Sequence, residues 1–106
     1  MKVLVDTSVL VASVLGEHEF HAAAFTVLDQ VQKGKNKGFV SAHSLAEMYD
    51  ILTRLPPPFR HPPEQAFLSI EENVVKHFKI TGLTGDDYRI LLREAAFGGS
   101  TRRHYL

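Results

Sequence analysis

Short apolar runs alternate with longer amphipathic segments along this chain, and the pattern predicts strands that alternate with helices. Residues 3–5 are all apolar and two of them are β-branched, as expected for a short strand buried on both faces. A helix is expected over residues 7–15, before Gly16, and a second helix over residues 18–33, where apolar residues recur at helical spacing.

The middle of the chain predicts a strand over residues 39–40 and a helix over residues 41–54. Three prolines at residues 56–58 end this helix, because proline cannot continue it. Its apolar face is expected to consist of Leu45, Met48, Tyr49 and Leu52. The next helix begins at residues 62–64, with proline in its first turn. Its buried stripe is expected to consist of Phe67, Ile70, Val74 and Phe78.

A third strand is expected over residues 79–83. A last helix follows, with Thr84 and Asp87 as a capping pair and with Gly98 and Gly99 at its end. Strands that alternate with helices imply a parallel sheet covered by helices, so the predicted fold class is α/β. Three short strands are few for this architecture, and we expect the sheet to be incomplete.

Composition narrows the choice of function only a little. Twelve Lys and Arg balance twelve Asp and Glu, so no global field attracts nucleic acid, although a local basic rim could still bind phosphates. The basic run at residues 34–38 is typical of a solvated loop. The absence of cysteine excludes a disulfide scaffold and a cysteine-based zinc site. The apolar stretch at residues 8–15 is too short to span a membrane, and we expect a cytoplasmic protein.

Asp6 is the first candidate for a functional residue. It directly follows the first predicted strand, and ligands of open α/β sheets gather outside the carboxyl ends of the strands. Asp6 is therefore a candidate metal ligand or catalytic acid, and the hydroxyls of Thr7 and Ser8 could orient it or a bound water. The alternative is structural, because Asp, Thr and Ser are also favoured N-caps of the helix that follows.

Glu47 is the second candidate, because its helix follows the second predicted strand and begins at the same edge of the sheet. Mg²⁺ and Mn²⁺ prefer oxygen ligands, and Mg²⁺ is commonly held by one or two carboxylates together with substrate phosphates. Such an ion can activate water for attack on a phosphodiester. Alternatively, Ser44 and Glu47 fit a capping box, but Ser41 is an equally good cap and would place Glu47 deeper in the helix.

The remaining acids and histidines carry weaker signals. Asp50 is expected on a solvated helix edge, and Asp86 at the start of the last helix. His18 and His21 are three residues apart, but no third ligand follows them at a spacing typical of zinc sites.

The segment VLVDTSVL at residues 3–10, taken with SAHSLAEMYDILTRLP at residues 41–56, resembles the PIN domain. The resemblance covers nearly the whole chain and is strongest to the VapC-like ribonuclease toxins of type II toxin–antitoxin modules. It implies an α/β/α sandwich that cleaves RNA with Mg²⁺ or Mn²⁺ held by three or four clustered acids. Asp6 matches the first acid of the family, Glu47 matches the second, and Ser8 matches a hydroxyl position near the first.

After residue 99 the chain departs from the family pattern, which continues into a helix with the third acid and a strand before the fourth. No Asp or Glu follows Glu94. We therefore expect a truncated PIN-like domain over residues 1–99 and a basic tail over residues 100–106, as a premature stop or a frameshift would leave. The first strand would keep an unpaired edge and an uncovered apolar face, which predicts self-association into a homodimer or higher oligomer.

Two functions follow from this resemblance. The first is a metal-dependent endoribonuclease, the toxin of a toxin–antitoxin module, which acts on RNA but is impaired by the loss of the third and fourth acids. The alternative is a catalytically inactive PIN relic that binds a cognate antitoxin or associates with itself. A small α/β domain whose acids only cap helices is a third interpretation, and the paired motifs disfavour it.

Overall fold

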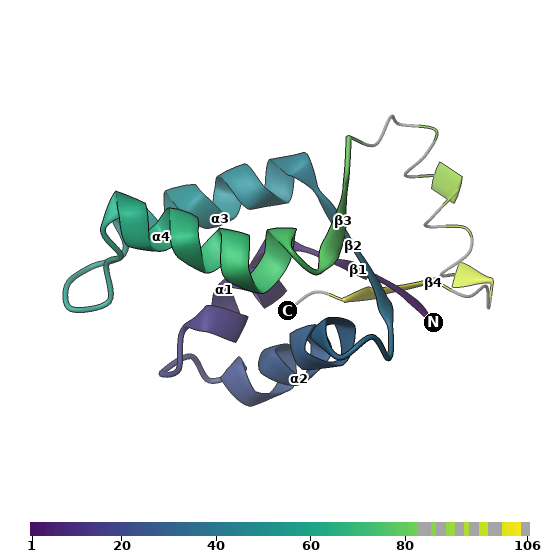
Figure 1. Ribbon diagram of the computed structural model, residues 1–106, viewed down its shortest axis with the longest axis horizontal. Helices are drawn as coiled ribbons and strands as arrows, with labels where there is room; N and C mark the ends of the chain where they lie inside the picture. Colours follow the sequence, from purple (N-terminus) through teal and green to yellow (C-terminus); the bar gives the residue numbers. More distant parts are fainter. Residues whose placement is uncertain (83–85, 87–88, 91–92, 94–95, 98–100, 105–106) are drawn as a thin grey trace.

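Four parallel strands form one sheet in the order β3-β2-β1-β4 in the part of the chain that the structure describes (Figure 1). The structure is a computed structural model, and it describes residues 1–82, 86, 89–90, 93 and 96–97 and the backbone of residues 101–104. The strands are β1 (Lys2–Val5), β2 (Lys37–Ser41), β3 (Phe78–Thr81) and β4 (Thr101–His104).

Helices connect the first three strands. They are α1 (Thr7–Val14), α2 (His21–Gln32), α3 (Ala42–Arg54) and α4 (Pro63–Ile70), and α4 continues into the π-helical segment η1 (Glu71–Val75). The connections from β1 to β2 and from β2 to β3 step in the same direction across the sheet. Right-handed crossovers therefore place all these helices on one face. Helix α1 packs against both α2 and α3, and α3 packs against α4, so the helices form one continuous layer (Figure 1).

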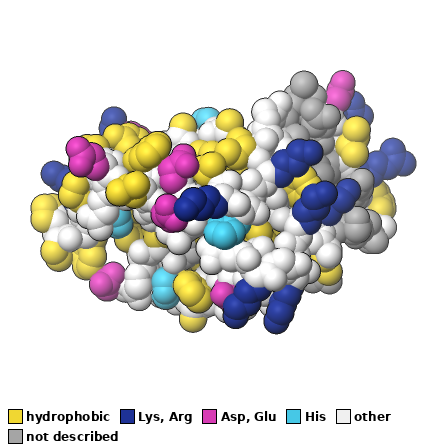
Figure 2. Space-filling model, viewed as in Figure 1, with side chains coloured by type: hydrophobic (Ala, Val, Ile, Leu, Met, Phe, Trp, Pro, Cys, Tyr) yellow, Lys and Arg dark blue, Asp and Glu magenta, His cyan; other side chains and the backbone are white. Residues whose placement is uncertain are grey.

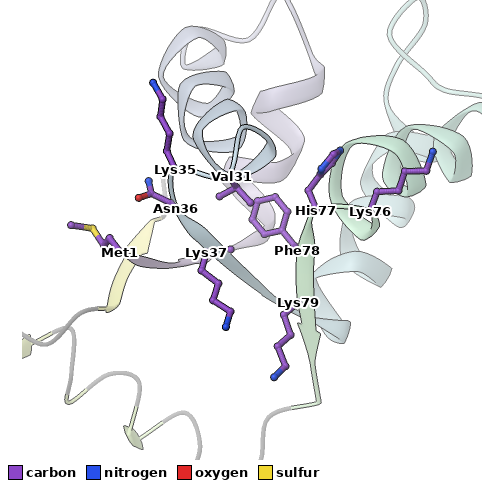
Figure 3. Close-up of a pocket in the computed structure, with 11 residues that line it drawn as sticks. Met1, Val31, Lys35, Asn36, Lys37, Lys76, His77, Phe78 and Lys79 are labelled. Carbon is purple, nitrogen blue, oxygen red and sulfur yellow. The ribbon is translucent and has the colours of Figure 1, made fainter.

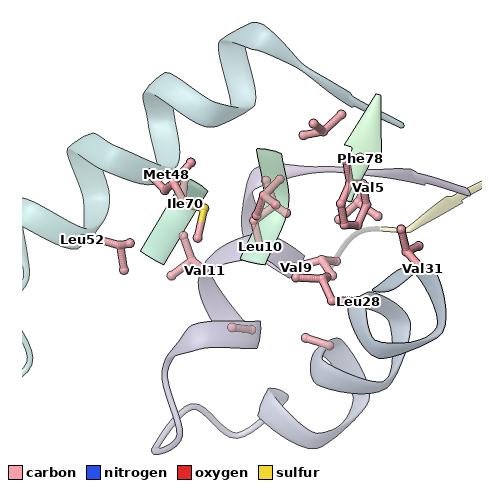
Figure 4. Close-up of a cluster of buried hydrophobic side chains, with 14 of the residues drawn as sticks. Val5, Val9, Leu10, Val11, Leu28, Val31, Met48, Leu52, Ile70 and Phe78 are labelled. Carbon is pink, nitrogen blue, oxygen red and sulfur yellow. The ribbon is translucent and has the colours of Figure 1, made fainter. Parts of the chain in front are cut away.

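The hydrophobic core lies between this helical layer and the sheet (Figure 4). Val3, Val5, Val40 and Phe78 alternate along the three strands and supply the sheet side of the core. The helices contribute Leu10, Met48, Leu52 and Val74, all fully buried. Because α1 is packed among the sheet, α2 and α3, a helix of only eight residues is held in place mainly by burial rather than by its own propensity.

Strand β1 is central in the sheet, which corrects one expectation. It pairs with β2 on one side and with β4 on the other, where Lys2 to Val5 align with Thr101 to His104. Leu4, outside the main core cluster, is also buried, with 6% of its surface exposed. The prediction that the first strand has an unpaired edge and an uncovered apolar face is therefore wrong, because a fourth strand supplies the second partner. Self-association loses the reason that motivated it and stays a prediction.

Two expected core side chains are exposed instead. Phe67 is 56% exposed and Tyr49 is 40% exposed. The buried side of α4 and η1 follows the four-residue spacing of Ala66, Ile70 and Val74, and Phe67 lies about 100° away around the helix. Phe78 is buried as expected, but it lies in β3 rather than in a helix.

The other elements agree closely with the sequence, within one to three residues at most boundaries. The third strand begins at Phe78 rather than at residue 79. Most of the last predicted helix lies outside the described residues, although Asp86, Arg89 and Arg93 are helical. Among the helices that the structure describes, none is long and apolar enough to cross a membrane.

Gly38 offers a test of the packing between β2, β3 and α2. A Cβ atom at Gly38 would lie 2.6 Å from Cδ2 of Phe78 and 2.7 Å from Cγ1 of Val31, both of which are buried side chains. We expect Gly38→Ala to lower the free energy of unfolding by about 1–3 kcal/mol, the usual cost of overpacking. Gly16→Ala is the matched control, because nothing lies within 4 Å of a Cβ there. Urea unfolding of both variants measures the difference, and equal stability of the two would contradict this packing.

Candidate active site at the carboxyl ends of β1 and β2

Asp6 stands between β1 and α1 and caps the helix. Its backbone is extended, with φ −97° and ψ 177°, and its side chain is the N-cap of α1. Oδ1 accepts hydrogen bonds from the backbone N of Ser8 at 3.1 Å, from Ser8 Oγ at 2.6 Å and from the backbone N of Val9 at 3.3 Å. The structural interpretation of Asp6 as a cap is therefore confirmed.

The cap occupies only one oxygen of the Asp6 carboxylate. All three hydrogen bonds that Asp6 receives within the described residues end on Oδ1, and none ends on Oδ2. The carboxylate is only partly buried at the sheet edge. Oδ2 therefore keeps its capacity to accept hydrogen bonds or bind a cation while Oδ1 holds the start of α1. Capping and ligand binding are compatible roles for this residue.

Glu47 lies one and a half turns into α3. The helix is capped by Ser41, whose Oγ accepts a hydrogen bond from the backbone N of Ser44 at 3.0 Å. Ser44 lies within the helix and is buried, so the capping box between Ser44 and Glu47 is wrong. With Ser41 as the cap, the exposed carboxylate of Glu47 is not needed to start the helix.

A hydrogen bond joins the two motifs. Thr7 Oγ1 donates to Glu47 Oε1 at 3.2 Å, across forty positions of sequence. This contact arises because β1 and β2 are parallel neighbours, so that the helices following them, α1 and α3, begin at the same edge of the sheet. Thr7 follows Asp6 directly in the chain. The structure thus brings the region of the first candidate acid against the second.

His43 is a further member of the site that the sequence argument missed. Its Nε2 lies 3.1 Å from Glu47 Oε1, one helical turn earlier on α3. The spacing of four residues between His43 and Glu47 was the available signal. Both Thr7 and His43 contact the same oxygen, Oε1, and no hydrogen bond or ion pair within the described residues involves Oε2. The Glu47 carboxylate is therefore oriented through one oxygen, as the Asp6 carboxylate is.

Other acids and histidines that the structure describes have partners elsewhere. Asp50 pairs with Arg54 at 2.9 Å on the exposed side of α3, as expected for a solvated edge. His21 Nδ1 lies 2.8 Å from the backbone oxygen of Ala12 and ties α2 to α1. Asp86 is exposed and faces Arg89 at 3.9 Å. Within the described residues, no group of three or more His, Cys, Asp or Glu side chains is placed to hold a metal ion.

Comparison with known proteins identifies the family. The family model described as PIN domain matches residues 2–96, nearly the whole chain. This chain belongs to the PIN domain family. The fold agrees, since the crystal structure of the Mycobacterium tuberculosis sarcin–ricin loop cleaving toxin VapC20 aligns with a TM-score of 0.57. That alignment covers 98% of this PIN domain and 72% of the VapC20 chain at 18% identity.

Curated relatives are also similar to this PIN domain. The ribonuclease VapC40 from two strains of Mycobacterium tuberculosis, CDC 1551 and H37Rv, is 38% identical over 87 residues. The match covers 81% of this chain and 52% of VapC40 in each case. The chain therefore spans about half the length of the curated relatives that it matches.

Substitutions at Asp6 separate its role as a cap from its charge. We expect Asp6→Ala to lower the free energy of unfolding by about 1 kcal/mol, because it removes the N-cap of α1. Asp6→Asn keeps a good capping side chain, so its stability should stay within about 0.5 kcal/mol of the parent. Thermal or urea unfolding measures both variants. A similar loss in both would mean that the negative charge, rather than the cap, stabilises this end of α1.

Proposed function

We propose that this PIN domain is a metal-dependent endoribonuclease that acts as the toxin of a toxin–antitoxin module in the cytoplasm. The hydrogen bond from Thr7 to Glu47 carries the proposal, because it brings the two family motifs together at the carboxyl ends of neighbouring parallel strands. The name of a similar protein supports the activity, since VapC40, which is 38% identical over 87 residues, is named a ribonuclease.

The residues present fit a hard divalent cation. Asp6 and Glu47 each offer one carboxylate oxygen that makes no hydrogen bond within the described residues. Mg²⁺ is commonly held by one or two carboxylates and completes its shell with water and substrate phosphates. Asp6 and Glu47 would hold Mg²⁺ or Mn²⁺ in this way. The bound ion would supply an activated water and would stabilise the charge that develops on an RNA phosphodiester.

The chain itself supplies orientation. Thr7 and His43 hold Glu47 through Oε1, and Ser8 holds Asp6 through Oδ1, so that the remaining oxygens keep fixed positions. The exposed pair between His43 and Glu47 adds at most about 1 kcal/mol to stability, so its main effect is to fix the rotamer of the carboxylate. The site is open to solvent on the side of Glu47, which suits a long polymeric substrate.

We further propose that the activity of this chain is impaired. Two carboxylates carry less negative charge than the three or four acids of the family pattern, and the described residues contain no third acid near them. Cation affinity and rate should both be low, because each missing carboxylate removes attraction for the ion. Substrate phosphates would then supply a larger share of the oxygen ligands around the cation.

An exposed apolar groove supports a cognate antitoxin as a partner of this domain. It equally supports the alternative function, an inactive module that binds an antitoxin. Tyr49, Phe67 and Leu68 line it together with Pro63 and Glu64, and its volume is about 640 Å³. Contiguous exposed apolar side chains are typical of protein interfaces. We propose a cognate antitoxin as the protein that covers this groove. An inactive antitoxin-binding module would need the same surface, so only an activity assay distinguishes the two functions.

Cleavage of RNA in the presence of Mn²⁺ is the decisive measurement. We expect slow cleavage by the parent chain and none above background by Asp6→Asn or Glu47→Gln, because each removes one charged ligand but keeps the shape of the side chain. Both variants should unfold at the same denaturant concentration as the parent. Asp50→Asn is the matched control, since Asp50 lies on the same helix outside the site. If the parent cleaves no more RNA than these variants, the enzyme proposal fails and the binding module remains.

The hydrogen bond from Thr7 can be tested by its effect on metal affinity. Thr7→Val keeps the branched shape but removes the donor to Glu47 Oε1. We expect Mn²⁺ affinity, measured by titration calorimetry, to fall about 10- to 100-fold, as for other residues that orient metal ligands. Thr53→Val is the control, because Thr53 donates only to backbone oxygens of its own helix. Unchanged affinity in Thr7→Val would show that Glu47 needs no support from α1.

A further inference from the structure

A row of lysines crosses the sheet at the opposite end from the two acids. Lys2 and Lys37 are register partners at the start of β1 and β2. Lys79 of β3 aligns with Phe39, two residues beyond Lys37. Because side chains alternate between the faces of a sheet, all three lysines lie on the face opposite Val3, Val40 and Phe78 and hence opposite the helical layer. We call Lys2, Lys37 and Lys79 the lysine row.

Two members of the lysine row, Lys37 and Lys79, line a basic pocket (Figure 3). The pocket has a volume of about 630 Å³, and its lining includes Lys35, Lys37, Lys76 and Lys79. Lys37 and Lys79 extend toward the same side of the sheet from neighbouring strands (Figure 3). Lys and Arg side chains also gather over the part of the molecule that carries the strands (Figure 2).

The positive charge of the lysine row is not neutralised by nearby acids. All three lysines are exposed, and none forms an ion pair within the described residues. By contrast, Lys76 pairs with Glu72 at 2.7 Å and Lys33 pairs with Asp29 at 2.9 Å. Like charges on neighbouring strands weaken a sheet slightly, so the row adds nothing to stability. Its charge is available to an external anion.

The backbone under the row is well fixed. The N–H of Lys37 donates to the backbone oxygen of Met1 at 2.9 Å, which continues the ladder between β1 and β2 back to Met1. Phe78 and Val31 fill the space over Gly38, and Phe78 is 5% exposed. The sheet therefore fixes the spacing of the Cα atoms of the row, and flexible side chains carry the ammonium groups outward from them. Several mobile cations on one face suit an extended polyanion, whose charges they can follow.

We propose that the lysine row binds backbone phosphates of an RNA whose cleavage site lies at Asp6 and Glu47. Strand β2 rises about 3.3 Å per residue, so its five residues place the row about 13 Å from the edge where α3 begins. An RNA of several nucleotides spans that distance, whereas a dinucleotide does not occupy both places. The part of this proposal that concerns Asp6 and Glu47 rests on the proposed ribonuclease function. Binding of RNA at the lysine row needs neither metal nor cleavage.

The test is RNA binding under conditions that prevent cleavage. The double variant Lys37→Gln and Lys79→Gln is compared with the parent chain in EDTA, by fluorescence anisotropy of a single-stranded RNA of about twenty nucleotides. We expect affinity at low salt to fall about 5- to 10-fold, and the slope of log affinity against log salt to shrink by about 1.4, or about 0.7 per lost phosphate contact.

The control is the double variant Arg54→Gln and Arg60→Gln, which removes the same charge from the far end of α3 and the loop after it. Equal losses of affinity in the two double variants would overturn the proposal, because the effect would then follow total charge rather than place. Equal losses on poly-glutamate and on RNA would also overturn it, in favour of an acidic polypeptide. Failure of the nuclease proposal would appear separately, as absence of Mn²⁺-dependent cleavage by a chain that still binds RNA.

Discussion

The parallel pairing of β1 with β2 is the constraint on which the rest of the site depends. It places the carboxyl ends of both strands at one edge, so that α1 and α3 must begin side by side. The residues that start the two helices, Asp6 and Ser41, are fixed by this geometry. The hydrogen bond between Thr7 and Glu47 is then a consequence, because the first turn of α1 meets the second turn of α3. A change of one residue in strand register would separate them.

The two roles of Asp6 explain why its sequence context was ambiguous. A carboxylate at the end of a strand is well placed both to cap the following helix and to meet a ligand. In the structure Oδ1 faces the amides of α1, and Oδ2, the oxygen that we propose for a ligand, makes no hydrogen bond in the described part of the chain. Sequence patterns identify the residue but not the oxygen, so they cannot separate these roles.

The sequence predicted the elements whose signals are local. The apolar run of β1, the cap at Ser41 and the prolines after α3 all act within a few residues. Strand β4 has no such signal, because Thr101–His104 is polar and its pairing is provided by the second side of β1, about one hundred residues earlier. The exposure of Phe67 follows from the buried side of α4 and η1 running through Ala66, Ile70 and Val74, whereas the apolar residues of this segment also fit a stripe through Phe67. His43 carried a local signal, its four-residue spacing from Glu47.

Net charge conceals how charge is distributed in this domain. Twelve cations balance twelve acids, yet the two candidate metal ligands stand at the carboxyl ends of the strands and the lysine row at their amino ends. Separation of this kind lets one small sheet attract phosphates at one end while keeping a negative site for a cation at the other. A uniformly basic surface would attract RNA more strongly, but it would also repel the divalent ion that we propose for the two carboxylates. The neutral total is therefore compatible with binding both a cation and a polyanion, because each meets a different end of the same strands.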